Sequence, residues 1–216
     1  MARILGDSES GKLGKKIYYN WHGRECVRAM PTHVANPKTE AQQAHRSNFA
    51  QISKLSSYMK EAHLVGFHWY AVREKNSTYA LFRQTNKDCF TPDGEIDYER
   101  LVVSKGSLEK AYIKSATVAD GVLSVSFDGH TYGDNGGDEF FLFVYSPTHS
   151  AGLLAEPIRH SVGKIALKLP TEWLYSEPSP DTLTQSSINT IQLHLYAFLR
   201  GRRLRTSDSV HMRLEI

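Results

Sequence analysis

The sequence predicts an α+β protein in two parts. Residues 1–94 are expected to form a basic β-hairpin plus two helices, and residues 95–216 an antiparallel β-sandwich of fibronectin type III or immunoglobulin-like character. Three observations favour this division. Apolar residues recur at helical spacing between positions 41 and 62, a strong turn signal stands at Thr91-Pro92-Asp93-Gly94, and strand-like runs separated by turn residues follow it.

The N-terminal segment is expected to be a tail followed by a hairpin. Residues 1–11 are polar and rich in glycine and serine after Leu5, which predicts a mobile or partner-ordered tail. Strand-forming residues then fill positions 16–28, and His22-Gly23 stands where a two-residue turn fits. Three cross-strand pairs would share one surface: Ile17 with Arg28, Tyr19 with Cys26, and Trp21 with Arg24. A two-stranded hairpin is marginally stable alone, so it must pack on something.

Two helices are expected after the hairpin. An extended link is predicted for residues 31–37, because proline stands at each end of it. Thr39 with Gln42 forms a capping-box signature, and the apolar spacing predicts a helix from Glu40 to about Leu64. A second helix is expected from near Ser77 to Cys89.

Seven strands are expected in the second part. Alternation of apolar and polar residues is clean in several of them, as an antiparallel sheet with one solvated face requires. The expected strands are residues 101–103, 112–118, 122–127, 139–145, 164–169, 191–199 and 210–216. A long loop rich in proline, serine and threonine is expected at residues 173–187.

Charge is distributed unevenly along the chain. The formal net charge is +3, but residues 1–60 hold ten Lys/Arg against four Asp/Glu, and residues 91–160 hold five against eleven. Such asymmetry indicates that the basic end meets an acidic partner, such as nucleic acid, or that copies assemble head to tail. The alternative is two solvated regions that differ in charge by chance.

Membrane insertion and secretion are not indicated. The apolar runs are far shorter than the roughly 20 residues of a membrane helix, so we expect no membrane span. The N-terminus has only the Ile4-Leu5 pair where a signal peptide needs a longer apolar stretch, which predicts no secretion signal and a cytoplasmic location. Cys26 and Cys89 are expected to be buried or half-buried thiols.

The sequence shows no recognisable reaction chemistry. His63 and His68 are separated by a spacing that does not align on one helical face, and the segment Asp128–Asp138 resembles a calcium loop in composition but not in spacing. Neither cysteine lies in a nucleophile motif, and no phosphate-binding glycine loop occurs. We therefore expect a protein that is not an enzyme and has no metal and no cofactor.

The basic and aromatic residues are the candidate binding residues. Arginine and aromatic side chains suit phosphate contact and base stacking, and equally suit docking on a protein. The candidates are Tyr19, Trp21, Arg24, Arg28, Arg46, Arg200, Arg202, Arg203 and Arg205. A solvated turn is the alternative for residues 200–205.

Several spaced motifs resemble a known family. The order is Gly11-Lys12-Leu13-Gly14, Trp21-x-Gly23, Val27-Arg28, Pro31, then Asn36-Pro37-x-Thr39-x-Ala41-Gln42 with Arg46 and Phe49, and far on Leu101-Val102-Val103-Ser104-x-Gly106-Ser107-Leu108. This pattern resembles an uncharacterised bacterial family common in Bacteroidetes, domain-of-unknown-function family 6266. The resemblance covers nearly the whole chain and implies no activity or catalytic residues, since the family has none established. Residues 200–205 and 173–187 depart from the family pattern.

Residues 36–49 also resemble, more weakly, segments of hypothetical phage and prophage proteins. We hypothesise a non-enzymatic binding or structural assembly protein, in the cytoplasm or incorporated in a phage-derived, virion-like or other multi-subunit assembly. A protein partner or self-assembly is then expected. The alternative is a nucleic-acid-binding protein that uses the basic aromatic hairpin, and an enzyme of unknown type comes third.

Overall fold

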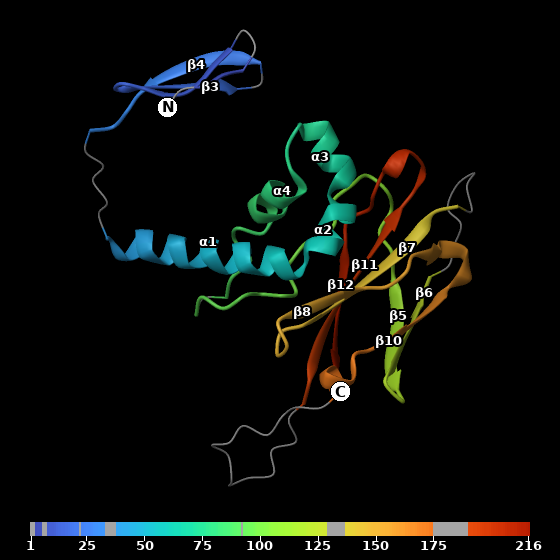
Figure 1. Ribbon diagram of the computed structural model, residues 1–216. Coiled ribbons are helices and arrows are strands. Elements are labelled where there is room, and N and C mark those ends of the chain that lie inside the picture. Colours follow the sequence, from blue (N-terminus) through green and yellow to red (C-terminus); the bar gives the residue numbers. More distant parts are fainter. Residues whose placement is uncertain are drawn as a thin grey trace. The chain divides into compact units, whose positions relative to one another are not determined.

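The chain forms two compact units, Met1–Gln43 and Ala44–Ile216, in the computed structural model (Figure 1). The structure describes residues 3–5, 8–21, 23–32, 38–91, 93–128, 137–174 and 190–216. The division expected after residue 94 is based on a change of sequence pattern and not on contacts within the fold, and it stays a prediction.

The first unit contains a four-stranded antiparallel sheet. Its strands follow one another in chain order: β1 (Arg3–Leu5), β2 (Ser8–Leu13), β3 (Lys16–Trp21) and β4 (Arg24–Ala29). The hairpin register is the one expected, with Tyr19 opposite Cys26 and Trp21 opposite Arg24. The expected tail is wrong for the residues that form β1 and β2. The chain reverses at Gly14, which has a positive φ of 58°, and β2 then pairs with β3. This pairing uses backbone hydrogen bonds, so a polar segment can form the strand without apolar side chains.

Four helices follow the sheet. They are α1 (Glu40–Tyr58), α2 (Lys60–Gly66), α3 (His68–Glu74) and α4 (Thr78–Thr85). The single helix expected to about Leu64 is interrupted at Met59, where φ is −99° and ψ is 19°. The second expected helix begins as predicted, because the Ser77 hydroxyl accepts a hydrogen bond from the Ala80 N–H at 3.1 Å.

Two antiparallel sheets make up the rest of the second unit. The three-stranded sheet has the order β10-β6-β5, from β5 (Ile113–Ala119), β6 (Val122–Phe127) and β10 (Lys164–Lys168). The five-stranded sheet has the order β12-β11-β7-β8, from β7 (Glu139–Ser146), β8 (Ala151–Leu154), β11 (Gln192–Arg200) and β12 (Val210–Glu215), while β9 (Ile158–Arg159) also pairs with β7. Short 3-10 helices lie at His160–Val162, Thr171–Leu174 and Arg202–Leu204.

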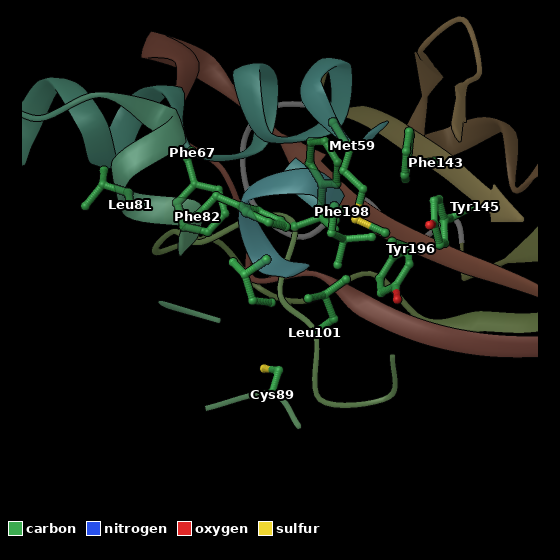
Figure 2. Close-up of a cluster of buried hydrophobic side chains, with 14 of the residues drawn as sticks. Met59, Phe67, Leu81, Phe82, Cys89, Leu101, Phe143, Tyr145, Tyr196 and Phe198 are labelled. Carbon is green, nitrogen blue, oxygen red and sulfur yellow. The ribbon is translucent and has the colours of Figure 1, made fainter. Parts of the chain in front are cut away.

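The central strands β7 and β11 of the five-stranded sheet are buried on both faces. Side chains of β6 and β10 pack on one face of β7 and β11, and Phe127 stacks on Phe140 with ring centroids 3.7 Å apart. The helices cover the other face, where Met59, Phe67 and Phe82 join side chains of β7 and β11 (Figure 2). Alternate residues of β7 therefore enter different cores, which explains why its sequence is a continuous apolar run.

The coarse fold prediction is confirmed: the protein is α+β and mostly antiparallel sheet. Residues 101–103 are not a strand, however. Their backbone is held by side chains instead of a ladder, since the Val102 N–H donates to Asn86 Oδ1 at 2.8 Å and the Val103 N–H to Ser209 Oγ at 3.1 Å. Within the part of the chain that the structure describes, no helix is both long and apolar enough to cross a bilayer.

Candidate binding surface

One face of the N-terminal sheet gathers four of the predicted binding residues. Strand pairing places Tyr19, Trp21, Arg24 and Arg28 on this face, together with Lys12 from β2. Trp21 is 59% exposed and Tyr19 is 40% exposed. The Arg28 guanidinium carbon lies 6.0 Å from the centroid of the Tyr19 ring, within the range of a cation–π contact. We call these five residues the aromatic-cationic face.

The opposite face of the sheet has a different character. Leu13 is 57% exposed and Val27 is 53% exposed, and the half-buried Tyr18 lies opposite Val27 in the neighbouring strand. Glu25 shares this side of the sheet. We call Leu13, Tyr18 and Val27 the apolar face.

No described side chain of the first unit is buried. Stable folds bury the apolar side of a sheet against a second layer, and this sheet has large apolar or aromatic side chains on each of its two sides. Among the described residues, this sheet therefore has large apolar or aromatic side chains exposed on both of its sides.

The remaining predicted residues belong to the second unit. Arg46 is exposed on α1, and Arg202 and Arg203 are exposed in the short 3-10 helix after β11. Arg205 is also exposed, and its Nε donates a hydrogen bond to Ser107 Oγ at 3.2 Å.

Arg200 is engaged within its own unit. Its Nε and Nη2 donate to Glu139 Oε2 at 2.8 and 2.6 Å, and its guanidinium carbon lies 4.7 Å from the centroid of the Phe141 ring. The side chain therefore ties the end of β11 to the start of β7, and any phosphate contact would compete with this ion pair.

A buried cluster of histidine and tyrosine side chains was not predicted. His194 Nδ1 lies 2.9 Å from His211 Nε2, and the Tyr98 ring centroid lies 4.5 Å from that of His194. The Tyr196 hydroxyl donates to the Tyr98 carbonyl at 2.8 Å, and Tyr145 packs against Tyr98. Tyr145 lies on β7 and Tyr196 on the neighbouring β11, and Figure 2 shows both side chains. The sequence signal is weak, because these residues come together only through the pairing of β7, β11 and β12.

Burial shifts the pKa of each of these five groups. Burial, together with smaller effects of His211 and Arg213, lowers the pKa of His194 to about 4, and burial also lowers the pKa of His211. It raises the pKa values of Tyr98, Tyr145 and Tyr196 above their usual range. At neutral pH the cluster is uncharged, and its contacts place Tyr98 against strands β7 and β11.

Comparison with known proteins agrees with the motif pattern. Residues 8–174 match a family of unknown function (DUF6266). The chain belongs to this family. No curated protein and no solved structure matches the chain. The match ends before β11 and β12, so it leaves out two of the strands that complete the five-stranded sheet.

This DUF6266 chain also has a small cavity of about 210 Å³ in the second unit. It is smaller than a usual ligand site, and charges of both signs line it. The lining residues are Ser107, Leu108, Glu109, Lys110, Tyr112, Asp128, Asp138, His160 and Leu199. The carboxylate of Asp128 is 3.5 Å from the ammonium of Lys114. Residues 129–136, the middle of the segment that resembles a calcium loop, lie outside the described residues, and the described residues contain no group of three metal-ligating side chains.

His63 and His68, the two histidines considered as possible metal ligands in the sequence, lie in different environments. His63 is buried, and its Nε2 lies 3.1 Å from both the hydroxyl and the carbonyl oxygen of Ser56. His68 is exposed at the start of α3. The two cysteines are free thiols, with Cys26 half-buried and Cys89 buried, as expected.

Proposed function

We propose that this member of DUF6266 is a non-enzymatic binding or structural assembly protein whose N-terminal sheet makes the contact. The observation that carries the proposal is the single-layer sheet with no buried side chain in its described part. Complete burial of one large apolar side chain stabilises a structure by about 1.5–3 kcal/mol. Covering Trp21 on one face, or Leu13 and Val27 on the other, would therefore contribute favourably to the free energy of binding.

A protein partner fits the composition of these faces. Tryptophan, tyrosine and arginine are the residues that most often dominate protein–protein interfaces, and the aromatic-cationic face has all three. We propose further that the two facing sheets are a β-sandwich of fibronectin type III or immunoglobulin-like character. Membership of a phage-derived or multi-subunit assembly, in the cytoplasm or in a virion-like particle, belongs to the same proposal.

The test is affinity isolation of the full chain under native conditions, combined with its molar mass in solution. Replacing Trp21 and Arg28 together by alanine should abolish partner binding and leave the circular dichroism spectrum unchanged. The matched control is Tyr112→Ala, because Tyr112 is an aromatic residue with 61% exposure in the second unit. A monodisperse monomer that recovers no partner would refute the proposal.

A second candidate function is binding of single-stranded nucleic acid. It is favoured by the charge on the aromatic-cationic face, where Lys12, Arg24 and Arg28 share the surface with Tyr19 and Trp21 and the described side chains include no carboxylate. Stacking of a base on an aromatic ring is worth about 1–3 kcal/mol, and phosphate contacts add a salt-dependent attraction.

A fluorescence titration with labelled single-stranded and duplex DNA over a range of salt concentrations tests this candidate. Affinity should fall with salt for the unmodified chain. Trp21→Ala should weaken single-strand binding about tenfold or more, which corresponds to the loss of one stacked base. Absence of binding at low salt would exclude the candidate.

A further inference from the structure

Strand β4 is an edge of the N-terminal sheet, since the strand order is β1-β2-β3-β4. We propose that β4 pairs antiparallel with β4 of a second copy of this chain, so that Val27 lies opposite Val27 of the partner subunit. This inference rests on the proposed assembly function and names the partner. An exposed edge strand presents unpaired backbone groups and is a template for pairing with another chain.

The hydrogen-bond pattern identifies the residues of β4 that present these groups. In an antiparallel pair, every second residue bonds the neighbouring strand. The Met30 N–H donates to the Lys15 carbonyl at 2.7 Å, and Arg28, Cys26 and Arg24 follow at steps of two along β4. These residues therefore direct their backbone groups towards β3. The N–H and C=O groups of the alternate residues, Glu25, Val27 and Ala29, point away from β3.

Like-charge repulsion disfavours the two registers adjacent to the proposed pairing. A two-fold axis perpendicular to the sheet would relate the two β4 strands, and residues directly opposite each other must then lie on the same face of the sheet. This condition is met only if the axis passes beside one residue of β4, which then lies opposite the same residue of the partner subunit. Centring on Cys26 would place Arg24 opposite Arg28, and centring on Arg28 would place that residue opposite itself. Both arrangements oppose like charges directly, which is destabilising. Centring on Val27 places Glu25 opposite Ala29 and opposes no like charges.

The same register continues the apolar face across the contact. Val27 is 53% exposed and lies opposite Tyr18 within its own sheet, so the pairing would join the two apolar faces into one surface. Pairing over Glu25, Val27 and Ala29 supplies about six backbone hydrogen bonds. A contact along one edge is small, so the dimer should depend on protein concentration.

The first test is sedimentation equilibrium of the full chain over a concentration series, with Val27→Pro and Val27→Thr as the matched pair. Proline removes the outward backbone N–H of residue 27 at the centre of the contact, and edge strands tolerate proline at such a position. Threonine keeps both the backbone and the side-chain shape. We expect a monomer–dimer equilibrium for the unmodified chain and for Val27→Thr, and dimerisation at least about tenfold weaker for Val27→Pro. Slow hydrogen exchange of the β3 amides in all three proteins will show that the sheet remains folded.

The second test is oxidative cross-linking of Val27→Cys in a Cys26→Ser background. Directly opposed residues at the axis are close enough for a disulfide, so this variant should form a covalent dimer, whereas the unmodified chain should not cross-link through Cys26. Cross-linking through Cys26 alone would overturn the register. A chain that is monomeric at every concentration, or a Val27→Pro variant that dimerises normally, would overturn the inference. A monomer that still binds another protein through Trp21 and Arg28 would refute this inference and support the proposed function.

Discussion

Acidification should destabilise the second unit through the His194–His211 pair. The two rings share a hydrogen bond of 2.9 Å, and burial holds the pKa of His194 at about 4 against 6.5 in an exposed chain. Well above pH 6.5 both the folded and the unfolded chain carry neutral imidazoles, and the pair contributes no pH dependence. As pH falls below 6.5, the unfolded chain takes up the proton first, so the free energy of unfolding falls until pH reaches about 4.

The size of this effect follows from the difference in pKa. One pKa unit corresponds to about 1.4 kcal/mol, which gives a loss of about 3 kcal/mol for His194 over the whole interval. The surrounding charges shift the two histidine pKa values in opposite directions. Arg213 lowers the pKa of His194, while Asp97 and Glu99 raise the pKa of His211. The tyrosines that also face the pair are neutral in this range; they are Tyr98, Tyr145 and Tyr196.

Urea unfolding at pH 7.0 and pH 4.5 measures this loss. Other groups also titrate in the interval, so the informative quantity is the difference between the unmodified chain and His194→Gln, which removes the titrating imidazole. The drop in unfolding free energy should be about 2 kcal/mol smaller in His194→Gln. His68→Gln, a change of an exposed histidine, is the control and should behave like the unmodified chain. Equal drops in all three proteins would refute the reasoning.

Two further predictions concern the loops that join the helices to the sheet. Asn86→Ala removes four hydrogen bonds of a fully buried side chain: to the Phe82 carbonyl, to the carbonyl and the N–H of Val102, and from the Cys89 thiol. The change should cost about 3 kcal/mol in urea unfolding, and an unchanged midpoint would contradict this. Gly106→Ala would place a Cβ 1.8 Å from the Thr206 carbonyl oxygen and should lower the thermal midpoint strongly. Gly137→Ala is the control, because no atom lies within 4 Å of its Cβ, and it should change stability by less than about 0.5 kcal/mol. Similar midpoints for the two variants would show that the close approach has no effect.

Local patterns predicted the elements that depend on local chemistry. The hairpin register follows from the turn position and the strand formers around it, and β6, β7, β10, β11 and β12 follow from alternation or from apolar runs. The break of the long helix at Met59 was not predicted, because the apolar spacing continues through it. Residues 101–103 have the composition of a strand, but Asn86 and Ser209 hold their backbone, and those contacts depend on tertiary structure.

The candidate sites show the same limit. The aromatic-cationic face was predictable, because a hairpin register determines which side chains share a surface. The contact between Arg200 and Glu139 joins residues far apart in sequence and depends on the pairing of β11 with β7, so the sequence alone does not distinguish Arg200 from Arg202, Arg203 and Arg205. The His194–His211 contact likewise requires the register of β11 against β12.

During synthesis, β7 is translated well before its long partner strand β11. This strand has both faces buried, but its central neighbour β11 begins only at Gln192, while β7 ends at Ser146. At about 5–20 residues per second, the ribosome takes about 2–10 seconds to add the intervening chain. During that time the run Phe140 to Tyr145 lacks its long partner strand and resembles an aggregation-prone segment. The nascent chain is therefore expected to need chaperone protection, and expression of residues 8–174 alone would make that exposed state permanent.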